Sequence, residues 1–182
     1  MGLTMRAAWK WLVLALAVGI LGVAGAVAYT FSKDTLLDLQ SCVDKPKFTG
    51  MGWVCGRLMA ITEPSADEIA FLNSIAGAGA IVGTHDAATA RHLMKRYLAS
   101  GLDVNAVDQR SDHLWTALHF AALSARTDEA RLLLEFGADP SRRDAQGRTP
   151  ADVAREGAQR RPNDAEQYLD LARLIDAASA RP

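Results

Sequence analysis

The sequence predicts an all-α fold, a short solenoid of about three helical repeats preceded by an N-terminal transmembrane or signal helix. Three observations support this prediction. Residues 116–139 read TALHFAALSARTDEARLLLEFGAD, in which two segments with apolar residues at helical spacing flank a polar turn. A similar pattern restarts 33 residues later, at residue 149. Residues 11–32, near the N-terminus, form a run of 22 residues without a charge.

The uncharged run is long enough to cross a bilayer as a helix. Arg6 and Lys10 precede it, and positive charges favour the cytoplasmic side of such a helix. We therefore expect residues 1–32 to form a single-pass anchor in a bacterial inner membrane, with the C-terminal domain in the periplasm. A cleaved signal peptide is the alternative, because two small-x-small cleavage sites lie within residues 24–28. The remaining chain would then be a soluble periplasmic protein.

Residues 33–64 form a segment outside the repeats that contains the only two cysteines, Cys42 and Cys55. An even number of cysteines in an exported segment favours a disulfide bond. Two reduced thiols are the alternative. A metal site is not expected, because two cysteines without neighbouring histidines do not supply four ligands.

Residues 65–182 are expected to form the repeat domain. Ser65 followed by two acidic residues indicates a helix start, and residues 87–100 carry a second helical pattern. The glycine-rich stretch at residues 77–85 lacks the Lys-Ser/Thr pair of a phosphate-binding loop, so we interpret it as a turn between helices. Residues 157–164 are interpreted as a surface loop within the last repeat.

The pattern Thr-x-Leu-His-x-Ala-Ala that begins at Thr116, followed by Leu-Leu-x-x-Gly-Ala-Asp, resembles the ankyrin repeat. Residues 101–108 match residues 137–144 at an offset of 36, so three extra residues fall in the finger loop between repeats. Gly137 follows the second helical segment, where the end of a helix favours a residue at positive φ. The resemblance implies that His119 makes hydrogen bonds within and between repeats. Three positions depart from the usual family pattern: Ala117, Ala125 and Asp152.

No catalytic arrangement is visible in the sequence. The four histidines are His85, His92, His113 and His119. None has a serine, cysteine or carboxylate at a spacing that indicates a catalytic triad or a metal site. The formal net charge of −1 gives no electrostatic case for nucleic-acid binding. We therefore expect no enzyme activity, cofactor, metal or small-molecule substrate.

The resemblance implies a protein-binding module whose concave face, formed by finger loops and inner helices, binds another protein. The residues expected on that face are Asp108, Gln109, Arg110, Asp112, His113, Trp115, Arg142, Arg143, Gln146 and Arg148. Tryptophan and arginine often dominate interface energies. Trp115 therefore either contacts the partner or packs back within the chain, and the sequence leaves both alternatives open.

Export and a binding face together predict a protein of the immunity type, which neutralises an effector that reaches the cell envelope. A scaffold or stress-protection protein that holds an envelope enzyme is the second hypothesis. A structural membrane subunit is the third. The sequence does not identify the partner.

Overall fold

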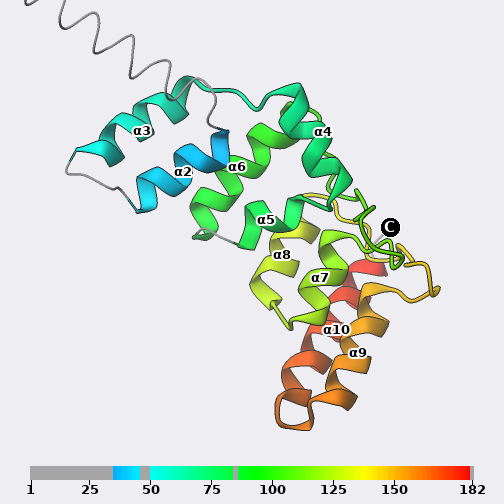
Figure 1. Cartoon of the computed structure of the whole chain (residues 1–182). Helices are drawn as coiled ribbons and strands as arrows, with labels where there is room; N and C mark the ends of the chain where they lie inside the picture. Colours follow the sequence, from blue (N-terminus) through cyan, green and yellow to red (C-terminus); the bar gives the residue numbers. More distant parts are fainter. Residues whose placement is uncertain (1–34, 46–49, 84–85, 181–182) are drawn as a thin grey trace, which may run out of the picture. The chain divides into compact units, whose positions relative to one another are not determined.

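The computed structural model describes residues 35–45, 50–83 and 86–180 of the chain (Figure 1). The predicted membrane or signal helix lies outside these described residues. Within the described ranges, every helix is too short or too polar to span a bilayer. The chain divides into two compact units, Met1–Ile61 and Thr62–Pro182, and each is described by itself.

The first unit contains two described helices, α2 (Leu36–Asp44) and α3 (Met51–Ile61). The start of α2 is a capping box. The Thr35 side chain accepts a hydrogen bond from the Asp38 N–H, and the Asp38 carboxylate accepts one from the Thr35 N–H. These bonds satisfy backbone donors that have no partner at a helix start.

A disulfide bond between Cys42 and Cys55 joins the two helices, as the sequence predicted. The Cα atoms are 6.1 Å apart, within the range that a disulfide can bridge. Among the described residues of this unit, only Leu39 and Cys55 are fully buried hydrophobic side chains. The cross-link stabilises the unit by about 3 kcal/mol for a loop of this size in the chain-entropy model.

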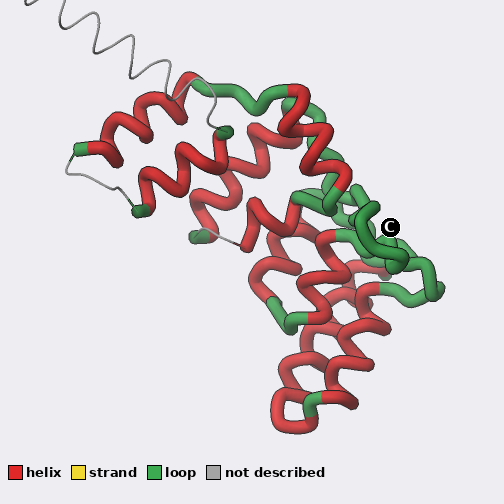
Figure 2. Tube along the Cα trace, in the orientation of Figure 1, coloured by secondary structure: helices red, strands yellow, loops and turns green. Residues whose placement is uncertain are grey.

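The second unit is a stack of helix pairs (Figures 1 and 2). Its elements are α4 (Ala66–Ser74), α5 (Ala78–Gly83), α6 (Ala87–Ala99), α7 (Ala117–Leu123), α8 (Thr127–Glu135), α9 (Pro150–Arg160), η1 (Pro162–Asp164) and α10 (Ala165–Ser179). Helices α5–α6, α7–α8 and α9–α10 pack as three pairs. Across the residues that the structure describes there are isolated β-bridges but no strand. The prediction of a helical solenoid with about three repeats is confirmed.

The glycine-rich stretch at residues 77–85 is not the turn that we expected, because it contains helix α5. Ala78 and Ile81 of this helix are buried. A Cβ atom at Gly77 would lie 2.6 Å from the Leu72 side chain, so only glycine fits there. The glycine provides space for close packing, and α5 is the first helix of the first repeat.

The expected surface loop at residues 157–164 is also wrong over its first half, because α9 continues to Arg160. Gly157 lies inside the helix and faces Tyr168 of α10. A Cβ atom at Gly157 would lie 2.5 Å from the Tyr168 ring. The glycine makes room for the aromatic ring without ending the helix.

Threonine begins the first helix of the second and third repeats. Thr116 forms a capping box with His119 at the start of α7, and Thr149 forms one with Asp152 at the start of α9. In the latter, the Asp152 carboxylate accepts the Thr149 N–H at 3.0 Å. Asp152 therefore satisfies the same backbone donor as the histidine that the family usually has, which explains why this departure is tolerated.

Gly137 follows α8 with a φ of +88°, as the sequence predicted. Its N–H donates to the Leu134 carbonyl at 3.1 Å, and the next N–H, of Ala138, donates to the Leu133 carbonyl at 2.9 Å. These bonds satisfy carbonyl groups at the helix end. The positive φ is the reason that glycine is favoured at this position.

We predict that Gly137→Ala lowers the free energy of unfolding by about 1 kcal/mol, because alanine is strained at positive φ. No atom lies within 4 Å of the added methyl group, so steric overlap does not contribute. Gly79→Ala is the control. Gly79 is helical, and its added Cβ would make an ordinary 3.6 Å contact with Ala117, so stability should hold or rise. Urea unfolding followed by circular dichroism measures both, and a Gly137→Ala variant as stable as the parent would contradict the prediction.

Candidate protein-binding face

Two loops between the repeats carry all ten residues that were predicted for the binding face. We call residues 105–116 the first finger and residues 139–149 the second finger. In the first finger the Asp108 N–H donates to the Trp115 carbonyl at 2.8 Å, which closes a hairpin. Figure 2 shows the loops of the second unit gathered along one side of its helices.

The second finger closes in the same way and also contacts the first. The Asp144 N–H donates to the Arg148 carbonyl at 2.9 Å. The Ala145 N–H donates to the His113 carbonyl, also at 2.9 Å. This bond joins the backbones of the two fingers, so their side chains form one surface.

A buried carboxylate stabilises the turn of each finger. In the first finger, Asp108 accepts hydrogen bonds from the Arg110 N–H at 3.0 Å and from the Arg110 guanidinium at 2.9 Å. The side-chain bond to Arg110 is the main cause that lowers the pKa of Asp108. The guanidinium itself is largely exposed, so Asp108 fixes its position while Arg110 remains open to a partner.

Asp144 has the same place in the second finger and makes more contacts. It accepts backbone N–H groups from Gln146 at 2.9 Å and Arg148 at 2.8 Å. It also accepts the Arg148 Nε–H and the Trp115 indole N–H, both at 2.9 Å. Burial raises the pKa of Asp144, but the hydrogen bonds from Arg148, Trp115 and Gln146 outweigh burial and lower the pKa to about 2. The carboxylate is therefore charged at any physiological pH.

Trp115 packs within the chain, which is one of the two alternatives that the sequence left open. Its ring stacks on His113 at 5.1 Å and on His119 at 6.4 Å between centroids, and Phe120 meets it edge-on at 5.4 Å. The Arg148 guanidinium lies 5.8 Å from the ring centroid. The ring is half-buried, so Trp115 joins the two fingers and leaves only part of its surface to a partner.

The other predicted face residues differ in how accessible they are. Asp108 is buried, and Arg148 is half-buried because its guanidinium bonds both Asp144 and Glu156. The remaining predicted residues are exposed on the fingers: Gln109, Arg110, Asp112, His113, Arg142, Arg143 and Gln146.

A groove of about 370 Å³ lies beside the first finger, between helices α5 and α7. Small, apolar side chains line one side of the groove, and charged side chains line its edge. The lining residues are Ile75, Ala76, Gly77, Gly79, Ala80, Arg110, Ala117, Phe120, Ala121, Ser124, Arg126 and Glu129. At the edge, Arg126 and Glu129 form an ion pair at 2.9 Å. Small side chains line most of this groove.

Sequence reasoning missed two exposed apolar residues on this face. Phe120 lines the groove and is 37% exposed, and Leu114 at the tip of the first finger is 44% exposed. Leu114 has a φ of +52°, a conformation that strains a leucine. The signal for Phe120 was a large aromatic residue in an alanine-rich helix that otherwise packs through small side chains.

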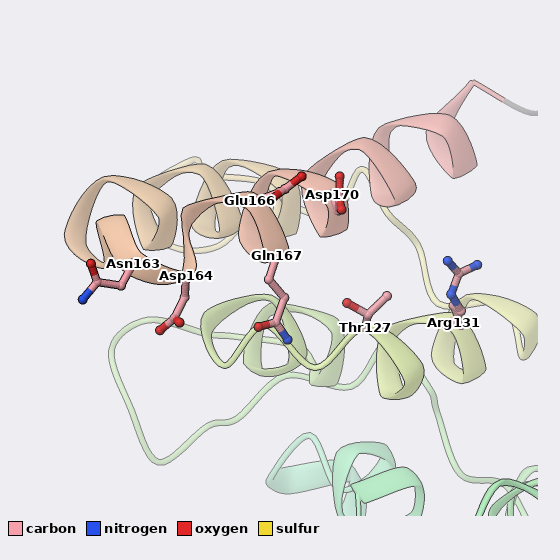
Figure 3. Close-up of a pocket in the computed structure, with 7 residues that line it drawn as sticks. All are labelled: Thr127, Arg131, Asn163, Asp164, Glu166, Gln167 and Asp170. Atoms are coloured by element: carbon pink, nitrogen blue, oxygen red, sulfur yellow. The ribbon is translucent and has the colours of Figure 1, made fainter.

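A second hollow, of about 500 Å³, lies between α8 and the start of α10 (Figure 3). Thr127 and Arg131 line it from α8. The lining residues from η1 and α10 are Asn163, Asp164, Glu166, Gln167 and Asp170. The Gln167 amide donates to the Ala125 carbonyl at 3.0 Å, so it links α10 to the preceding repeat. Over the described ranges, no cluster of three or more His, Cys, Asp or Glu residues is placed to hold a metal ion.

His119 links the helices to the second finger. The Thr116 N–H donates to His119 Nδ1 at 3.3 Å, so the ring proton is on Nε2, which donates to the Arg148 carbonyl at 3.2 Å. The structure thus agrees with the role that the ankyrin resemblance implied. Burial is the main cause that lowers the pKa of His119.

Comparison with known proteins identifies the repeats. A family model of ankyrin repeats in three copies matches residues 84–165. These residues include helices α6 to α9 and both fingers. Residues 84–165 are therefore ankyrin repeats, and ankyrin repeats are protein-binding modules.

The similar curated proteins are much longer than this chain. It is 39% identical over 88 residues to the E3 ubiquitin-protein ligase hecd-1 of Caenorhabditis elegans, which covers 48% of this chain and 3% of that protein. It is 48% identical over 64 residues to the E3 ubiquitin-protein ligase Ufd4 of Drosophila melanogaster, or 35% of this chain and 2% of that protein. It is 41% identical over 61 residues to the 2-5A-dependent ribonuclease of Mus musculus, which covers 34% of this chain and 8% of that protein. The chain thus spans only a small part of these proteins, and their activities are not assigned to it.

We predict that Trp115→Phe lowers the free energy of unfolding by about 1 to 2 kcal/mol, because it removes an N–H that donates to a buried carboxylate. In an Asp144→Asn background the same substitution should cost less, since the charged acceptor is already lost. Trp53→Phe is the control, because Trp53 is 69% exposed and should change stability by less than about 0.5 kcal/mol. Urea unfolding of the parent, the two single variants and the double variant measures the coupling free energy between Trp115 and Asp144. Losses of stability that are strictly additive would contradict this prediction.

We predict that stability falls as pH drops below about 6.5, the ordinary pKa of histidine. The unfolded chain binds a proton there, whereas buried His119 keeps its neutral form until a lower pH. Protons therefore favour the unfolded state, by at most about 1.4 kcal/mol per pH unit for one group. Urea unfolding at pH 7.5 and at pH 5.5 should show the loss.

The control separates His119 from the other histidines. His119→Asn should start less stable at neutral pH and show a smaller loss on acidification. His92→Asn, at an exposed position on α6, should keep the full loss. An unchanged pH dependence in His119→Asn would show that another group causes it.

Proposed function

We propose that this chain is a non-enzymatic protein-binding module that holds a segment of its partner in the groove between α5 and α7. The groove itself carries the proposal. Its floor is made of glycine and alanine, which allows the partner's backbone to lie close to the helices. Phe120 offers an exposed aromatic surface at its side, and such residues often dominate interface energies.

The first finger adds a polar anchor at the same groove. Arg110 lines the groove, and Asp108 fixes its guanidinium by hydrogen bonds to Nε and Nη2. A guanidinium has five N–H donors, so further donors remain for a carbonyl or carboxylate group of a partner. A fixed guanidinium also loses less conformational entropy on binding than a free one. We therefore assign Arg110 to orient the partner and Phe120 to provide apolar contact.

We propose further that residues 1–32 anchor the chain in the inner membrane and that both units face the periplasm. Arg6 and Lys10 before the uncharged run support this orientation. The Cys42–Cys55 disulfide supports an oxidising compartment. Cleavage of the anchor would leave the same binding face in the periplasm as a soluble protein.

In this location we propose an immunity-type role, in which the groove and fingers bind and neutralise an effector that acts on the envelope. A small domain with no assigned catalytic group can protect a cell by covering a surface of another protein. Other proposed roles of the same face are a scaffold or stress-protection protein for an envelope enzyme. A structural membrane subunit would instead bind through its anchor.

We predict that Phe120→Ala weakens partner binding about tenfold or more, which corresponds to about 1.4 kcal/mol. The parent chain, immobilised, should capture a specific protein from envelope extract. Phe71→Ala is the matched control, because Phe71 is exposed on α4 and does not line the groove. Capture should persist with Phe71→Ala and fall with Phe120→Ala, and circular dichroism should show that both variants are folded. Equal capture by all three would place the site elsewhere.

The captured protein then separates the proposed roles. Exporting it into the periplasm of a test cell should stop growth, and co-expression of this chain should restore growth, if the role is immunity. A captured envelope enzyme that is harmless when exported would favour the scaffold role. Capture that requires residues 1–32 and is unaffected by Phe120→Ala would favour the membrane subunit.

A further inference from the structure

Helix α3 of the first unit has an apolar stripe that faces away from α2. Trp53 and Ile61 on this stripe are 69% and 78% exposed. Arg57 lies between them, with its guanidinium 5.6 Å from the Trp53 ring centroid. A spacing of four residues places these side chains on one face of the helix. Buried Cys55, which is cross-linked to α2, is two residues from Trp53 and thus about 200° around the helix.

The composition of α3 suits an interface between water and lipid. Its sequence is MGWVCGRLMAI, in which Arg57 is the only charged residue and no side chain is acidic. Tryptophan is enriched at membrane interfaces, where its ring lies at the level of the headgroups. Helices that lie on membranes combine aromatic and aliphatic residues with basic ones. An arginine next to an exposed tryptophan can also donate hydrogen bonds to lipid phosphate.

The length of chain before α2 limits how far α3 can be from a membrane. The uncharged run ends at residue 32 and α2 begins at Leu36, so at most about 14 Å of extended chain separates them. The nine residues of α2 extend about another 14 Å. The disulfide keeps α3 beside α2. Every part of α3 is therefore within reach of a bilayer that the run would cross, and the short tether keeps the local concentration of that bilayer high.

We infer that α3 lies on the bilayer surface next to the anchor, with Trp53 and Ile61 among the lipid headgroups and Arg57 at the lipid phosphates. This inference rests on the proposed membrane anchor of residues 1–32. It assigns the first unit a function of its own. The disulfide-linked helices would bind the membrane surface beside the anchor.

The test uses the full chain reconstituted into phosphatidylcholine vesicles with brominated acyl chains, which quench nearby tryptophan fluorescence. Trp9 and Trp11, which lie outside the described residues, are both changed to phenylalanine, so that Trp53 and Trp115 remain. The fluorescence of this chain is compared with that of the same chain carrying Trp53→Phe. The difference reports Trp53 alone, and flotation of the vesicles reports the anchor.

The chain should float with the vesicles, and brominated lipid should quench at least about half of the Trp53 fluorescence, with little quenching by aqueous acrylamide. The control places tryptophan at Phe71, which is 60% exposed in the second unit, in a Trp53→Phe background. That tryptophan should be open to acrylamide and not quenched by lipid.

Each other outcome rejects the inference in a distinguishable way. A chain that does not float overturns both the anchor and the inference. A chain that floats with Trp53 open to acrylamide overturns the inference alone. Trp53 protected from acrylamide but unquenched by lipid would mean that protein covers α3. Lipid quenching at position 71 as well would mean that the whole chain adsorbs, without a specific role for α3.

Discussion

The buried carboxylate of Asp144 joins both fingers to the helices beneath them. It accepts two backbone N–H groups of its own finger, the indole N–H of Trp115 from the other finger, and the guanidinium of Arg148. The Arg148 guanidinium in turn binds Glu156 of α9, and the Arg148 carbonyl accepts a hydrogen bond from His119 Nε2. Burying a charged carboxylate away from water costs free energy, and these donors offset that cost. The exposed face therefore has a fixed shape because its supporting contacts satisfy one buried charge.

The features that the sequence revealed correctly each have a local cause. Gly137 occupies a backbone conformation that other residues tolerate poorly. The Cys42–Cys55 pair follows from a cysteine count of two in a segment expected to be exported. The fingers were located because the same residues recur in register. Local chemistry and repetition were thus enough to predict the solenoid and the loops that present its binding residues.

The parts that the sequence did not reveal depend on contacts between distant residues. Gly77 and Gly157 looked like helix breakers. Gly157 instead lies inside α9 and makes room for Tyr168, whereas Gly77 does lie between helices and also makes room for Leu72. The sequence does not state which of these two roles a glycine has. The groove was missed as a consequence, because one of its walls is α5, which we had interpreted as a turn. The burial of Asp108 was missed and the packing of Trp115 within the chain was left open, because both depend on the contacts that their side chains make.

The packing that forms the groove also limits how its binding specificity can change. A larger side chain at Gly77 would collide with Leu72, and Ala117 and Ala121 are buried between helices. The floor of the groove is therefore fixed by the stability of the stack. Residues at its edge are under no such constraint, since Phe120 and Arg126 are exposed. A related chain that binds a different partner would keep the glycine and alanine floor and change the edge, because substitutions there alter recognition without altering the fold.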